Sequence, residues 1–201
     1  MISISDFIKG FHGSIPGSEN LKPWDITMQI NKFILAILSG VQSDYIIKNG
    51  VALHNSAIIE EGAVIKGPAV ISDACFIGAG AYLRDGVFLG PNVSIGPGCE
   101  IKSSILFNGT RIAHFNFIGD SLIGNDVNFE AGAVIANHYN ERNDKIIQVK
   151  YKSELISTGI EKFGALVGDH SRIGANSVLS PGTILNKNSI VKRLELVEQI
   201  R

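Results

Sequence analysis

The sequence predicts a parallel β-helix, an all-β solenoid, and two observations carry this prediction. An aliphatic residue or a substitute recurs every six residues between positions 53 and 140. Within each block, turn formers follow the aliphatic residue and a small or branched residue comes next, as in Ile95–Glu100, which reads IGPGCE. A six-residue period fits neither an α-helix nor an amphipathic strand, and it is typical of a parallel β-helix.

The predicted inward positions contain two five-residue steps, which follow Ala113 and Ile118. These positions are Leu53, Ile59, Ile65, Ile71, Ile77, Leu83, Leu89, Ile95, Ile101, Phe107, Ala113, Ile118, Ile123, Phe129 and Ile135. One block buries its aliphatic residue only when similar blocks stack above and below it. The pattern resembles the left-handed hexapeptide-repeat acyltransferases, and this resemblance implies that three blocks form one triangular coil of eighteen residues.

Residues 1–50 lack the six-residue rhythm and predict a short N-terminal helical cap. Helices are expected to begin at Ser5–Ile8 and at Trp24–Ile30, with the second continuing to Gly40, and His12–Gly17 is expected to be a loop. We expect this cap to pack on the first coils and to cover a sheet edge that would otherwise be unpaired.

Residues 51–201 form the predicted β-helix domain, interrupted by an insertion at 138–164. The insertion begins with a polar, turn-like stretch and continues with alternating residues at 146–151, which suggests a hairpin. Long loops that interrupt a rigid array are often functional. The six-residue spacing resumes at Val167, and residues 192–201 are expected to form a short amphipathic closing segment.

Composition argues against nucleic-acid-binding, membrane-spanning and secreted proteins. The net charge of −1 gives no general attraction for nucleic acid or an anionic membrane surface. No apolar stretch approaches the ~20 residues of a membrane helix, and no basic region followed by an apolar run marks a secretory N-terminus. We therefore expect a cytoplasmic protein. Cys75 and Cys99 occupy the fifth place of their blocks, where small buried side chains are expected rather than a disulfide or a metal pair.

Three cations share the second place of their blocks at intervals of eighteen residues: Lys66, Arg84 and Lys102. Stacked on neighbouring coils they would repel one another, so a bridging phosphate is one explanation of the pattern. Three solvated basic side chains on a polar face are the other. His114 lies in a block where the rhythm slips, and its imidazole could act as a general base or have a structural role among the neighbouring phenylalanines.

A more specific resemblance rests on runs between residues 83 and 137: LRDG, EIK, HFNFIGDS and IGNDVNFEAG, followed by Asn137. These runs resemble the acetyltransferase half of bifunctional glucosamine-1-phosphate acetyltransferase and N-acetylglucosamine-1-phosphate uridylyltransferase. The later part, with Lys150, Thr158–Gly159 and Lys162–Ala165, is similar to the archaeal sugar-1-phosphate nucleotidylyltransferase and acetyltransferase branch. The resemblance covers roughly residues 20–190.

The resemblance implies an acetyl-CoA-dependent N-acetyltransferase that acts on an amino-sugar phosphate such as glucosamine 1-phosphate. The sugar amine would attack the thioester directly, with His114 as its base and with no Cys or Ser nucleophile and no metal. The other implied site residues are Arg84, Lys102, Phe117 and Asn128 for the substrate, and Asn137 and Asp169 for the cofactor. The family also implies a homotrimer with its sites between neighbouring prisms.

Two departures affect the expected substrate and donor. Phe117 stands where the family has Tyr, and losing one hydrogen bond to an anionic ligand would cost ~1.5–3 kcal/mol. Asp169 stands where the family has Ser in the stretch that meets the cofactor. A nucleotide-linked amino sugar is therefore an alternative acceptor. With about 50 residues in place of the relatives' nucleotidyltransferase domain, uridylyl transfer is not expected.

Two other classes of protein compete with this interpretation. One is a non-catalytic scaffold or regulatory subunit of a sugar nucleotidyltransferase, which the change to Phe117 favours. The other is a zinc hydratase of the same fold, which requires three His ligands at an interface. His54, His114, His138 and His170 are the candidates, and only His114 has a site-like setting in the repeats.

Overall fold

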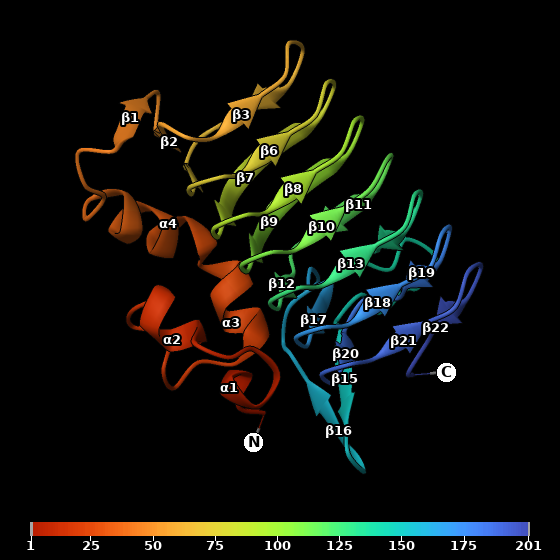
Figure 1. The fold of residues 1–201 in the computed structure, drawn as a ribbon. Helices are drawn as coiled ribbons and strands as arrows, with labels where there is room; N and C mark the ends of the chain where they lie inside the picture. Colours follow the sequence, from red (N-terminus) through yellow and green to blue (C-terminus); the bar gives the residue numbers. More distant parts are fainter. Residues whose placement is uncertain (1, 201) are drawn as a thin grey trace.

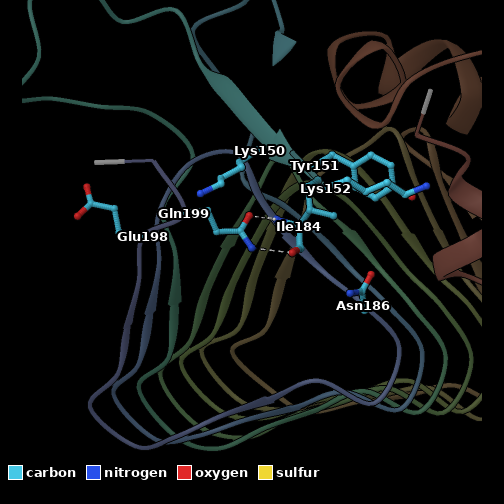
Figure 2. Close-up of a pocket in the computed structure, with 7 residues that line it drawn as sticks. All are labelled: Lys150, Tyr151, Lys152, Ile184, Asn186, Glu198 and Gln199. Atoms are coloured by element: carbon cyan, nitrogen blue, oxygen red, sulfur yellow. Dashed lines mark hydrogen bonds between the residues drawn. The ribbon is translucent and has the colours of Figure 1, made fainter. Parts of the chain in front are cut away.

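The computed structural model describes residues 2–200 and confirms the predicted parallel β-solenoid (Figure 1). Its strands form three flat faces, which close into a three-sided prism when seen along the axis (Figure 2). Face one is the seven-stranded sheet. Its strands are β3 (Ile58–Ile59), β6 (Phe76–Ile77), β8 (Ser94–Ile95), β10 (Arg111–Ile112), β13 (Asn128–Phe129), β18 (Arg172–Ile173) and β21 (Ile190–Val191).

Faces two and three share the thirteen-stranded sheet, because β7 (Tyr82–Leu89) and β9 (Glu100–Leu106) bend around the corner between them. Face two also contains β4 (Val64–Ile65), β11 (Phe117–Gly119), β14 (Val134–Ile135), β19 (Val178–Leu179) and β22 (Leu196–Val197). Face three contains β2 (Val51–His54), β5 (Ala69–Ile71), β12 (Leu122–Ile123), β17 (Ala165–Val167) and β20 (Thr183–Leu185).

The bend in β7 and β9 changes the register between coils by one residue. Arg84 pairs with Lys102, eighteen residues on, whereas Val87 pairs with Ser104, seventeen residues on. In β7 the corner takes two residues with positive φ, Asp85 and Gly86, at 59° and 96°. The corner of β9 has only Ser103 in this conformation, at 45°.

This shorter corner corrects the predicted repeat phase. Pairing aligns Leu106 with Leu89 and Ile112 with Ile95, so Leu106 and Ile112 point inward rather than Phe107 and Ala113. The five-residue steps therefore end at Leu106 and Ile123. Phe107 misled the prediction because it is buried from outside the prism, where its ring stacks on Phe11 at 5.3 Å.

The outward residues of face three form a second apolar core beneath the N-terminal helices. These residues are Ala52, Val70, Phe88, Ile105, Leu122, Leu166 and Ile184. The helices are α1 (Ile4–Phe7), α2 (Phe11–Ser14), α3 (Pro23–Met28) and α4 (Ile30–Leu38). They run beside the prism in Figure 1. The helices cover face three, and the sheet edge is covered, as expected, by a later segment of the predicted cap, because β1 (Tyr45–Lys48) pairs with β2.

Two details of the cap also differ from the prediction. The expected second helix is split at Gln29, which leaves the helical region at φ −107° and ψ 18°. The expected loop at His12–Gly17 contains most of α2, because the fully buried Phe11 anchors a helical turn there. Among residues 2–200, no helix combines the length and the apolar character needed to cross a bilayer.

The insertion is the expected hairpin, formed by β15 (Gln148–Tyr151) and β16 (Glu154–Ser157). Its buried Ile147 and Val149 join the core beneath the cap helices. The closing segment differs from the prediction, because β22 adds a further strand to face two. Beyond it, the Gln199 side chain accepts a hydrogen bond from Ile184 N at 2.9 Å and donates one to Ile184 O at 2.8 Å, which satisfies the last strand of face three (Figure 2).

The two cores give a stability prediction for a pair of phenylalanines. Phe107→Ala should lower the free energy of unfolding by ~3–5 kcal/mol, because it leaves a cavity against Phe11. Phe115→Ala is the control, since this side chain is 73% exposed and should change stability by about 0.5 kcal/mol or less. Urea denaturation measures both variants. Equal losses would show that Phe107 does not hold the cap on face three.

Candidate active site

His114 lies at the corner between faces one and two, between the end of β10 and the start of β11. The corrected phase puts it at the third place of its block rather than the second. Its side chain is exposed, while its carbonyl oxygen accepts hydrogen bonds from Gly132 N at 2.9 Å and from Asn116 Nδ2 at 3.1 Å. The corner therefore holds the main chain of His114 rigidly and presents its imidazole to solvent.

Asn116 fixes this corner and was not predicted as a site residue. Its side chain is 2% exposed, and Oδ1 accepts a hydrogen bond from Ala133 N at 2.9 Å. Its two bonds tie the His114 turn to the next coil. In the corrected phase Asn116 occupies the fifth place of its block. Other blocks carry the buried polar residues Thr110, Ser171 and Ser177 there, so no distinct sequence signal marks Asn116.

Arg84 and Lys102 lie in register at the opposite corner, between faces two and three. Carboxylates of the same chain already pair with both of them. Arg84 Nε lies 2.8 Å from Glu100 Oε1, and Lys102 Nζ lies 2.9 Å from Asp120 Oδ2. A bridging phosphate is therefore not needed to explain why these two cations are stacked, since carboxylates of the chain offset their repulsion.

Asp120 is the centre of a network that reaches Asn137. Asn137 Nδ2 donates to Asp120 Oδ2 at 2.5 Å, and Asn137 is 7% exposed. Gly119 makes room for this contact, because an added Cβ would meet Asn137 Nδ2 at 2.9 Å and the Phe117 ring at 2.9 Å. The eighteen-residue spacing from Lys102 to Asp120 was the sequence signal for this residue, and it was missed.

Phe117 lies on face two beside this network. It pairs in register with Glu100 on one side and with Val134 on the other, and its side chain is half-buried. Phe117, Arg84, Lys102 and Asn137 therefore share one region of face two and its corner. His114 is at the other edge of the same face.

Asn128 and Asp169 lie elsewhere. Asn128 is exposed on face one. Asp169 is 3% exposed, and its carboxylate accepts hydrogen bonds from Lys9 N at 2.9 Å and Asn125 N at 2.8 Å. It thus ties the N-terminal cap to the prism. Within one protomer the seven predicted residues occupy three regions rather than one cleft.

Neither cysteine has the setting of a nucleophile. Both are buried, as predicted, and neither forms a disulfide. Burial raises the pKa of Cys75 to about 11, and burial also raises the pKa of Cys99. Both thiols stay protonated near neutral pH, so an acyl-cysteine intermediate is disfavoured. Among residues 2–200, no group of three or more His, Cys, Asp or Glu side chains is arranged to hold a metal ion.

One cleft, of about 390 Å³, reaches the network, since its lining includes Asp85, Ser103 and Asp120. Two others lie away from it. The first of these, of about 530 Å³, lies between the hairpin and the last coils (Figure 2). It is lined by Lys150, Tyr151, Lys152, Ile184, Asn186, Glu198 and Gln199, none of which is a predicted site residue. A second cleft, of about 500 Å³, includes Asn128 and lies along face one. The predicted residues therefore lie mainly on open faces of the prism.

Two protein families match segments of the solenoid, one ending within the insertion and one after it. Residues 65–153 match the family described as GMPPB C-terminal domain, and residues 165–192 match the family described as hexapeptide repeat of succinyl-transferase. The chain is 44% identical over 173 residues to the bifunctional protein GlmU of Methanococcus maripaludis strain C7, covering 84% of this chain and 41% of the relative.

Two other archaeal relatives are also similar in sequence. Identity is 35% over 172 residues with the GlmU of Methanocaldococcus jannaschii, covering 83% of this chain and 41% of the relative. It is 42% over 83 residues with the bifunctional sugar-1-phosphate nucleotidylyltransferase/acetyltransferase of Sulfurisphaera tokodaii, covering 41% of this chain and 20% of the relative. The chain thus spans less than half the length of these relatives.

The network around Asp120 gives a prediction that does not depend on activity. Asp120→Ala leaves the mostly buried Lys102 and Asn137 without their partner, which should lower the free energy of unfolding by ~1–3 kcal/mol. Glu61→Ala removes an exposed carboxylate and should change it by about 0.5 kcal/mol or less. Thermal and urea unfolding of both variants test this. Indistinguishable unfolding curves would contradict the role given to Asp120.

Proposed function

The chain is a hexapeptide-repeat protein related to the bifunctional sugar-1-phosphate nucleotidylyltransferase/acetyltransferases, and from this premise we propose that it is an acetyl-CoA-dependent N-acetyltransferase. Its acceptor is an amino-sugar phosphate resembling glucosamine 1-phosphate. The observation that carries the proposal is the arrangement of face two. A solvent-facing imidazole stands at one edge, and Arg84, Lys102 and Asn137, each hydrogen-bonded to a carboxylate, stand at the other.

In the proposed reaction the neutral imidazole of His114 accepts a proton from the sugar amine. The amine nitrogen attacks the thioester carbonyl, a C–N bond forms, and the C–S bond breaks as the CoA thiolate leaves and takes up a proton. General-base catalysis of this kind typically contributes 10²–10⁴-fold. The fixed main chain of His114 supports the role, because a rigid base holds its geometry against the bound amine.

Arg84 and Lys102 would hold the sugar phosphate although carboxylates already neighbour them. Arg84 uses Nε toward Glu100 and Nη1 toward Asp85, which leaves the donors of Nη2. The Lys102 ammonium carries three donors and faces Asp120 and Ser103. In this proposal the carboxylates orient both cations before the substrate arrives. Asn137 and Asp169 stay assigned to the cofactor as part of the proposal.

We propose that the working unit is a homotrimer with shared sites. Helices and the insertion cover face three, so faces one and two are the ones left to meet other copies. In a threefold arrangement, face two of one prism would approach face one of its neighbour. Asn128 on face one would then complete the site around His114 and Phe117 of the neighbouring copy.

The pairing of Arg84 and Lys102 within the chain also favours a second candidate. A cation group that is neutralised by its own carboxylates is stable without a ligand, which suits a non-catalytic scaffold subunit that retains the pocket. Phe117 fits this candidate too, because its ring cannot donate the hydrogen bond of a Tyr hydroxyl.

The decisive assay is thiol release from acetyl-CoA with glucosamine 1-phosphate and, in parallel, with a nucleotide-linked glucosamine. Wild-type protein should release thiol with one of them, and His114→Ala should lower kcat by 10²–10⁴-fold. His54→Ala, a change near the first coil, should leave the rate unchanged. Binding of acetyl-CoA without thiol release from any amino sugar would favour the scaffold candidate.

A further inference from the structure

A row of two arginines with an asparagine between them lies on face one. Arg111, Asn128 and Arg172 occupy the outward position of three successive coils, in register on β10, β13 and β18. All three side chains are exposed. Adjacent strands are ~4.8 Å apart, so the two arginine Cα atoms are about 10 Å apart. The outward positions of face three, in contrast, are apolar and buried beneath the helices.

No carboxylate compensates these charges. None of the ion pairs among residues 2–200 includes Arg111, Arg172 or the nearby Lys192. Arg84 and Lys102 contrast with them, because both have carboxylate partners. Arg111 and Arg172 lie on either side of the strand that carries Asn128, so an anion placed over Asn128 would lie between the two positive charges.

A cleft of about 500 Å³ continues from this row toward the last coils. Its lining includes Asn128, Arg172, Ile190 and Lys192. Glu130 and Arg193, the other charged residues in the cleft, pair with each other. Glu130 accepts hydrogen bonds from Arg193 Nε at 2.7 Å and Nη2 at 2.6 Å. These bonds lower the pKa of Glu130 to about 2. Arg172 and Lys192 are therefore the cations in the cleft that are free for a ligand.

We propose that Arg111, Asn128, Arg172 and Lys192 bind the diphosphate group of a nucleotide. Three free cations match the charge of a diphosphate better than that of a single phosphate monoester. Arginine forks bind phosphate oxygens in pairs, and the Asn128 amide adds a neutral donor between them. The exposed Ile190, in register with Arg172, offers an apolar contact for the attached organic group.

The source of the nucleotide rests on the proposed function. A coenzyme A donor and a nucleotide-linked amino-sugar acceptor both carry a diphosphate. The proposed trimer brings face one of one copy against face two of its neighbour, so either ligand would lie beside His114 of that neighbour. The row would therefore favour ligands that carry a diphosphate over ligands that lack one.

Equilibrium binding tests this inference without turnover. Calorimetry would compare inorganic pyrophosphate, coenzyme A, UDP-glucosamine and uncharged pantetheine on wild type and on the double variant Arg111→Gln/Arg172→Gln. Pyrophosphate and one of the two nucleotides should bind at least ~10-fold more weakly to the variant, while pantetheine is unaffected. The nucleotide that pyrophosphate displaces identifies the source.

The controls separate this site from the proposed reaction. Lys32→Gln/Lys48→Gln removes two exposed charges elsewhere and should bind all probes like wild type. His114→Ala should retain diphosphate binding, so loss of catalysis and loss of this site are distinguishable. Unchanged binding in the arginine variant would overturn the proposal. Dissociation of the oligomer in that variant, seen by size exclusion, would overturn it as well by making the row a subunit contact.

Discussion

The register of main-chain hydrogen bonds between coils is the constraint on which the rest of this structure depends. Each coil has little core of its own, and it buries its aliphatic residues only when it is stacked on its neighbours. The same register places Arg84 beside Lys102 and Lys102 beside Asp120. Because side chains alternate across a strand, a shift of one residue would turn these groups into the prism. Backbone pairing thus determines which positions of neighbouring coils lie close enough to form the charged network.

Within the coils, the residues with positive φ and the one-residue change in register lie at the corners of the prism rather than on its faces. Positive φ at Asp85 and Gly86 lets β7 turn from face two to face three, and the shorter corner at Ser103 removes one residue from the next coil. The polar groups of the candidate site gather at such corners. His114 precedes Phe115, which has φ 56°, and Asp120 has φ 48°. Corners place side chains at the rim of a flat face, where a ligand can reach them.

The sequence predicted the solenoid well because inward aliphatic residues have a strict period. The predicted phase failed at Phe107, since burial beneath the helical cap and burial inside the prism require the same kind of side chain. His114 was therefore placed one position early in its block. Asp120 was missed because its importance comes from a contact with Asn137, which no repeat rule describes. Asp169 was expected at the cofactor, and its present contacts depend on where the distant N-terminal cap packs.

The central claim is that the site is shared, with His114 contributed by face two of one copy and Asn128 by face one of its neighbour. Co-expression of His114→Ala and Asn128→Ala subunits tests it most directly. Each variant alone should be inactive, and mixed trimers should recover activity, because some interfaces then contain an intact His114 and an intact Asn128. No recovery in mixed trimers, shown to have formed by differential tagging, would contradict a site built between two copies.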